Sequence, residues 1–258
     1  MEDLKPIWRV NRKPRFTVLE LGEYMAADDG PRETILRNMH YERVSRSLIY
    51  RLLWPAVSRF LASPTRDRRI LAECKIALEE AIRSNENPQG KENLKYELNA
   101  LAAFERSLNA LEIGGLNLER AAPRRLMIEG VTVSVRPSAH ILVSRQRGAN
   151  LHGAVVIDVA KGIVEPKTDD AKARLTDGMT HSAIILHQHV VETTPEGGKP
   201  SPEHCFIFHT HRQERVAAPA SYKKTYRNIE AVCRNIARSW NGIVPPASFD
   251  KTRATYRN

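Results

Sequence analysis

The stretch "VTVSVRPSAHILVSRQRGANLHGAVVIDVAK", residues 131–161, decides the fold class. At its start, apolar Val131, Val133 and Val135 alternate with polar residues. An apolar side chain at every second position indicates a strand with one buried face. Pro137 and the loop RGANLHG then separate two further short apolar runs. Three short strands with tight connections predict an antiparallel meander.

The first 111 residues have helical periodicity instead. A segment that opens at Asp29-Gly30-Pro31 predicts a helix up to Trp54-Pro55, where the proline should kink or restart it. A second helix is expected after Ser63-Pro64, and a third over about residues 91–111. Residues 1–111 are therefore expected to form one helical layer. This segment begins with a basic arm that contains Arg9, Arg12, Lys13 and Arg15, followed by the short possible strand FTVLEL.

Beyond the three strands, periodicity predicts a helix over about residues 169–191 and a strand at CFIFHTH with a short partner that reaches Val216. A last helix is expected from Ser221 to about Trp240, and residues 243–258 read as a loose tail. The expected fold is α+β. Its N-terminal helical layer packs on a small mixed β-sheet in a core over residues 112–242, with two further C-terminal helices.

The charge balance points to polyanions. Forty Lys and Arg face thirty Asp and Glu, a net charge of +10 over 258 residues. A field of that sign attracts nucleic acid first and an anionic membrane surface second. Three scattered cysteines without a CxxC pair favour a reducing cytoplasm, and no apolar run approaches the ~20 residues that cross a bilayer. We expect a cytoplasmic nucleic-acid-associated protein that does not span a membrane.

From residue 91 the expected order is helix, three strands, helix, strand, helix. It resembles the αβββαβ core of the restriction-endonuclease-like PD-(D/E)XK superfamily, over about residues 91–240. In that superfamily an acid and a (D/E)xK pair hold a divalent metal beside a phosphate. The resemblance implies a Mg²⁺ site in which Asp158 and Glu165 hold the ion, Glu129 is a further acid, and Lys167 assists the attacking water.

Two placements of this motif compete. Asp158 and Lys161 are three residues apart, so a regular strand directs them to opposite faces. Glu165-Pro166-Lys167 has the required spacing, but its proline restricts it to a strand end or a sheet edge. The same residues also fit an ordinary hairpin with solvated charges. Since Pro137 is followed by Ser138, not by the acid of the superfamily pattern, binding is favoured over cleavage.

The last helix carries the clearest pattern for polyanion binding. Its basic residues lie opposite the apolar stripe from Tyr226 to Trp240, and Glu230 alone interrupts them. Together with the basic arm they predict a surface that neutralises phosphates of DNA or RNA without reading bases. The alternative is a merely solvated helix face. The predicted phosphate-binding residues are Lys223, Arg227, Arg234, Arg238, Arg124 and Arg125.

Two histidine pairs suggest metal ligands. His187 and His189 are about 200° apart around a helix and cannot converge on one ion. His209 and His211 would share a strand face, but no third ligand accompanies them, so zinc is unlikely. The second hypothesis for the whole chain is a non-enzymatic interaction or regulatory module whose N-terminal helices dock a protein partner.

Overall fold

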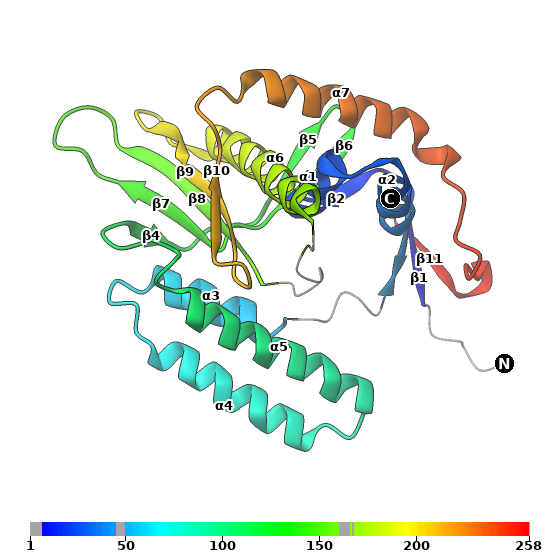
Figure 1. The fold of residues 1–258 in the computed structure, drawn as a ribbon, viewed down its shortest axis with the longest axis horizontal. Coiled ribbons are helices and arrows are strands. Elements are labelled where there is room, and N and C mark those ends of the chain that lie inside the picture. Colours follow the sequence, from blue (N-terminus) through cyan, green and yellow to red (C-terminus); the bar gives the residue numbers. More distant parts are fainter. Residues whose placement is uncertain (1–6, 45–49, 160–165, 167, 258) are drawn as a thin grey trace.

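The computed structural model describes residues 7–44, 50–159, 166 and 168–257, and Figure 1 shows the arrangement. Its largest sheet has five strands in the order β10-β9-β8-β7-β4. Strands β8 and β9 are parallel, and the other neighbours are antiparallel. The chain is therefore an α+β protein with a mixed sheet, as the sequence predicts. The strands are β4 (Asn117–Glu119), β7 (Ala139–Val143), β8 (Leu151–Asp158), β9 (Lys199–His209) and β10 (Glu214–Ala217).

Strand β8 is buried on both faces and separates two hydrophobic cores. Val155 and Ile157 belong to one core, whereas Ala154 and Val156 belong to the other. Alternation along a strand directs successive side chains to opposite faces, so a strand covered on both sides is apolar throughout. Its parallel neighbour β9 is reached through α6 (Asp169–Thr193), which covers one face of the sheet.

The opposite face of the large sheet is covered by three helices, which form the lower part of Figure 1. They are α3 (Leu53–Ala62), α4 (Arg69–Ser84) and α5 (Pro88–Ser107). The second expected helix is confirmed as α4, and its Leu71, Cys74 and Leu78 are buried in this core. Pro55 lies in the first turn of α3, where proline needs no hydrogen-bond donor, so it kinks nothing.

On the α6 side lie α1 (Val18–Ala26), α7 (Lys223–Ser239) and a second sheet in the order β2-β6-β5. Its strands are β2 (Arg15–Thr17), β5 (Arg124–Ile128) and β6 (Val131–Val135), and α7 lies over β5 and β6 in Figure 1. The predicted stripe of α7 is confirmed, since Ile229, Cys233 and Ile236 are buried, followed by Trp240 in η2 (Trp240–Gly242).

A third sheet joins segments from far apart in the sequence. Strand β1 (Trp8–Asn11) pairs in parallel with β11 (Ala254–Arg257), which follows η3 (Lys251–Arg253), and antiparallel with β3 (Tyr41–Arg43). The prediction of a loose tail over residues 243–258 is therefore wrong for residues 251–257. Their order comes from pairing with a distant strand, which leaves no periodicity in a four-residue segment.

The predicted meander of three strands is also wrong. Strands β7 and β8 pair with each other, but β6 pairs with β5 and with β2 in the second sheet. The first of the expected strands thus has its partners elsewhere. Two strands that the sequence does not predict lie before it, β4 and the start of β5, within residues 112–125.

The single helical layer expected over residues 1–111 divides into two parts. Helices α3–α5 cover one face of the large sheet, whereas α1 and α2 (Asp29–His40) lie on the α6 side. The expected strand FTVLEL ends at Thr17, because Thr17 and Glu20 form a capping box that starts α1. The expected helix from Asp29 to Trp54 ends at His40 and is followed by β3.

No helix in the described part of the chain has both the length and the apolar character that a membrane span requires.

Candidate functional site

A deep groove lies over the solvent-facing side of the second sheet. Strand register places Thr17, Ser134 and Arg125 side by side on that face, and Arg15 beside Thr132. The opposite face is apolar, since Phe16, Val133 and Leu126 are buried in the core. The alternation of these short strands therefore places cations and hydroxyl groups together on the outer side.

The third sheet supplies the other wall of the groove. Arg9 is paired in register with Glu42, and Asn11 with Arg257, so these side chains share one face. Arg9 Nη1 lies 3.3 Å from a Glu42 carboxylate oxygen. The Asn11 amide donates to the Met39 carbonyl oxygen at 2.7 Å, which fixes the end of α2 against this wall.

We call this feature the arginine groove. Its volume is about 770 Å³, and it is lined by six arginines and two glutamates, Glu20 and Glu42. Among the described residues, only Arg9 of the six is paired with a carboxylate. The other five form neither a salt bridge nor a side-chain hydrogen bond with any described residue; they are Arg15, Arg124, Arg125, Arg136 and Arg257.

Arg15 is the most constrained of these cations. Its Nη1 atom exposes less than 1 Å² and has no hydrogen-bond partner among the described residues. The pKa of Arg15 is lowered, first by burial and then by the positive charges of Arg257 and Arg125. The charge of Glu42 acts in the opposite direction, but its carboxylate already pairs with Arg9. An anion bound in the groove would offset these charges.

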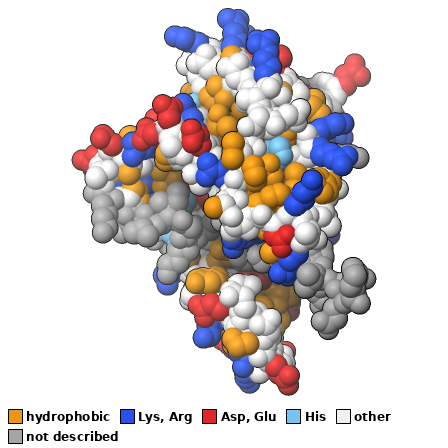
Figure 2. Space-filling view, turned by 90° about the vertical axis from the view of Figure 1, so that its right-hand side faces the viewer, with side chains coloured by type: hydrophobic (Ala, Val, Ile, Leu, Met, Phe, Trp, Pro, Cys, Tyr) orange, Lys and Arg blue, Asp and Glu red, His pale blue; other side chains and the backbone are white. Residues whose placement is uncertain are grey.

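The basic stripe of α7 is exposed as predicted, but one of its members is already neutralised. Lys223, Arg227 and Arg238 face solvent without a salt bridge to a described residue. Arg234 donates to Glu129 at 3.1 Å, and this contact holds the pKa of the Glu129 carboxyl below its usual range. On the face shown in Figure 2, Lys and Arg side chains gather mainly at the top and along the right-hand side.

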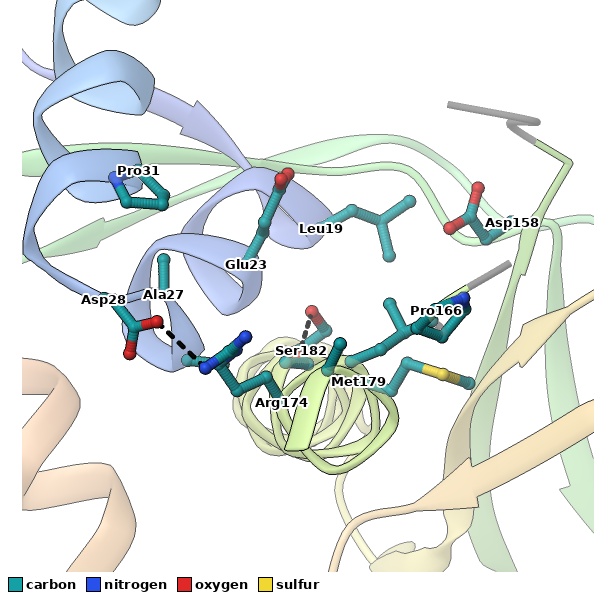
Figure 3. A pocket seen from close by; sticks show the side chains of 14 residues that line it. Leu19, Glu23, Ala27, Asp28, Pro31, Asp158, Pro166, Arg174, Met179 and Ser182 are labelled. Atoms are coloured by element: carbon teal, nitrogen blue, oxygen red, sulfur yellow. Dashed lines mark hydrogen bonds and ion pairs between the residues drawn. The ribbon is translucent and has the colours of Figure 1, made fainter. Parts of the chain in front are cut away.

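Asp158 lies in a different pocket, of about 500 Å³, between α1, α6 and the end of β8. Apart from a few charged groups the lining is apolar, and Figure 3 shows Leu19 between Asp158 and Glu23. The pKa of Glu23 is raised, first by desolvation and then by the negative charges of Glu20 and Asp158. Across the pocket, Arg174 pairs with Asp28 at 2.9 Å.

The residues of the predicted magnesium site are not all found in the pocket of Asp158. Glu129 does not line the pocket of Asp158; it occupies the two-residue turn between β5 and β6 and pairs with Arg234. Glu165 and Lys167 lie outside the described residues. Within the described ranges, no three His, Cys, Asp or Glu side chains are grouped to hold a metal ion. Of the predicted carboxylates, Glu129 is not brought to the pocket of Asp158, and the assignment of Mg²⁺ to Asp158, Glu165 and Glu129 stays a prediction.

The histidines are arranged partly as expected. The ring of His187 contacts Tyr222, with centroids 4.5 Å apart, whereas His189 faces Arg124 and His140, so the two point to different sides of α6. The expectation that His209 and His211 share a strand face is wrong, because β9 ends at His209 and His211 lies in the following turn.

Sequence patterns located part of the arginine groove. Arg124, Arg125 and the basic arm were identified, but Arg136 and Arg257 were not, because each is an isolated cation whose place depends on strand pairing. A comparison of the chain with protein-family models gave no match, and a search of curated proteins likewise found no significant similarity.

Proposed function

We propose that this protein binds the phosphate backbone of nucleic acid, with the arginine groove as its main contact and the α7 stripe as an extension. The observation that carries the proposal is the set of five arginines that line one groove without a carboxylate partner among the described residues. Guanidinium groups match phosphate oxygens through paired hydrogen bonds, and nucleic acid is the common ligand that presents many such groups.

The orientation of α7 supports the extension. Its C-terminal end is anchored to the third sheet, because Trp240 Nε1 donates to the Asn11 carbonyl oxygen at 2.8 Å. The stripe therefore leads toward the part of the molecule that forms the groove wall (Figure 1). None of the groove residues offers a base-reading element of a known type, so the proposal is backbone contact without strong sequence preference.

A salt titration of binding tests the proposal. Fluorescence anisotropy of labelled DNA and RNA should give an affinity that falls linearly with the logarithm of salt concentration. Replacing Arg125 or Arg136 with glutamine should reduce that slope by about 1, the value for one lost phosphate contact. Arg83→Gln is the matched control, since Arg83 is an exposed cation at the end of α4 that forms no salt bridge with a described residue. An equal effect of all three variants, or no binding at low salt, would refute the proposal.

Cleavage is a subordinate part of the same proposal. If the protein is a nuclease, Asp158 is the acid that it depends on, and the reaction requires Mg²⁺. A nuclease assay with Mg²⁺ should then lose its signal in Asp158→Ala while nucleic-acid binding persists. If the wild type and the variant are both inactive, the nuclease hypothesis is refuted and the binding hypothesis remains.

The free cysteines Cys74, Cys205 and Cys233 are all buried, which suits the reducing cytoplasm that we propose as the location of the protein.

The competing hypothesis is that the protein is a module that docks a protein partner through its N-terminal helices, in particular α4 and α5. Ile76 of α4 is 56% exposed and Tyr96 of α5 is 44% exposed, so both side chains are accessible to a partner. Such a module should bind nucleic acid negligibly even at low salt. The salt titration therefore separates the two hypotheses without requiring the partner to be known.

A further inference from the structure

The arginine groove has a shape that backbone contact alone does not require. A helix stripe such as that of α7 is convex and meets successive phosphates along a strand. The groove instead is concave, and its cations converge from four strands: Arg9 on β1, Arg15 on β2, Arg125 on β5 and Arg257 on β11. A concave site with convergent charges favours a compact ligand over an extended one.

Its charge also exceeds what one backbone phosphodiester can neutralise. Arg15, Arg125 and Arg257 line the same cavity, the positive charges of Arg257 and Arg125 act on Arg15, and Glu42 is engaged by Arg9. A phosphodiester carries one negative charge and has two free oxygens. A phosphate monoester carries about −1.5 to −2 at neutral pH and presents three acceptor oxygens. The monoester therefore suits the arginine groove better.

The groove also offers neutral donors beside its cations. The hydroxyl groups of Thr17 and Ser134 lie on the same face as Arg125, and Asn38 lines the same cavity. Arg15 Nη1 is buried and has no acceptor among the described residues. A hydrogen bond from this atom to a ligand oxygen would therefore satisfy a buried donor. Hydroxyl, amide and guanidinium donors around one cavity are typical of a site for a discrete anion.

We infer that the arginine groove binds a terminal phosphate monoester of a nucleic-acid strand, with Arg15 at its base and Arg125 and Arg257 beside it. This inference rests on the proposed function and narrows it, because it assigns a strand end to the groove and the continuing backbone to surrounding cations. A free nucleotide has the same monoester chemistry but lacks the strand that would reach those cations.

The test compares single-stranded oligonucleotides that differ only at their ends. Competition anisotropy would use one sequence with a 5′-phosphate, a 3′-phosphate or hydroxyl groups at both ends, and a nucleoside monophosphate as a further competitor. One of the phosphorylated strands should bind about tenfold more tightly than the hydroxyl-ended strand. The mononucleotide should compete much more weakly than that strand.

Variants separate the groove from the general charge. Arg15→Gln should abolish the preference for the phosphorylated end, and Arg125→Gln, at an exposed position, should reduce it without affecting folding. Arg238→Gln on α7 should weaken all strands alike and leave the ratio unchanged. Thermal unfolding of each variant shows whether the fold is intact.

The outcomes distinguish the two proposals. Salt-dependent binding without any end preference overturns the terminal-phosphate site but leaves backbone binding in place. Equal competition by the mononucleotide overturns the strand end as the source of the monoester. Absence of binding to every oligonucleotide overturns both.

Discussion

His189 lies between α6 and the large sheet in a setting that disfavours its charged form. The side chain is 5% exposed, and its Nδ1 has no hydrogen-bond partner among the described residues. The pKa of His189 is lowered to about 4, first by burial and then by the positive charge of Arg124 and by His140. The imidazole is therefore neutral in the folded protein at neutral pH.

This setting predicts a loss of stability in mild acid. In the unfolded chain His189 takes up its proton near pH 6.5, but in the folded protein only near pH 4. Between these values the unfolded state binds more protons, so stability falls as the pH decreases through this window. The loss approaches roughly 3 kcal/mol at its lower end. Urea denaturation at a series of pH values from 7 to 4 measures it.

The matched variant is His189→Gln, which cannot take up a proton. Its unfolding free energy should depend less on pH than that of the wild type. The dependence should not vanish, because the pKa values of His140 and His187 are also lowered by burial. Parallel pH profiles for the two proteins would exclude His189 as the group responsible.

At the scale of elements, α1 and α6 cross at very close range. A Cβ atom on Gly22 would overlap the Ser182 hydroxyl and the Gly178 carbonyl oxygen. Ser182 Oγ lies 3.1 Å from the Val18 carbonyl oxygen and 2.9 Å from that of Gly178, so the hydroxyl links the two helices. The absence of a side chain at Gly22 is what permits this contact.

Gly22→Ala should therefore destabilise the protein by about 2 kcal/mol, the cost of overpacking a core contact. Gly30→Ala is the control, because a Cβ at Gly30, in the first turn of α2, meets nothing within 4 Å. Alanine there should be neutral or slightly stabilising. Urea unfolding midpoints compare the two, and equal midpoints would show that α1 can shift to accommodate the methyl group.

The start of α3 depends on a residue of another helix. Glu97 of α5 is 2% exposed, and its carboxylate accepts hydrogen bonds from the backbone N–H groups of Arg51, Leu52 and Leu53 at 3.0–3.1 Å. The first N–H groups of a helix lack intrahelical partners, and a carboxylate also interacts favourably with the helix dipole.

Glu97→Ala should lower the free energy of unfolding by about 3 kcal/mol, since it leaves buried donors unsatisfied. Glu97→Gln keeps one acceptor oxygen, so its free energy of unfolding should lie between those of the wild type and Glu97→Ala. Glu73→Ala, at an exposed position of α4, should have little effect. Chemical denaturation monitored by circular dichroism measures all three, and a neutral Glu97→Ala would mean that water satisfies the end of α3.

At the scale of the whole molecule, the arginine groove combines both ends of the described chain with its middle. Arg9 and Arg257 come from strands that pair across nearly the full sequence, and Arg125 comes from the second sheet. Like charges held together destabilise the protein that holds them. The clustered arginines thus lower the stability of the fold and at the same time create a surface that attracts anions.

Arg257→Gln should therefore stabilise the ligand-free protein slightly at low salt while it weakens nucleic-acid binding. The gain should vanish at high salt, because exposed charges are then screened. Thermal unfolding at two salt concentrations checks this, with Arg83→Gln as the control for removal of a cation elsewhere. A lower unfolding temperature for Arg257→Gln at low salt would contradict mutual repulsion in the groove.

The helices of this molecule could be predicted from the sequence, whereas the pairing of its distant strands could not. The apolar stripes of α4, α5 and α7 repeat over several turns, so local periodicity was sufficient to identify them. The pairs β1–β11 and β2–β6 involve strands of three to five residues that are far apart in sequence, and no local pattern shows which strands pair with each other. The places of Arg136 and Arg257 follow from that pairing, so two of the six groove arginines could not be anticipated.

The unneutralised guanidinium groups also couple the folding equilibrium to the solvent. Any anion that occupies the groove binds the native state and not the unfolded chain, so it adds to the free energy of unfolding in proportion to the logarithm of its concentration. The protein should consequently melt at a higher temperature in sulfate or phosphate than in chloride of equal ionic strength. The melting temperature that is measured for this protein will therefore depend on the anion in the buffer.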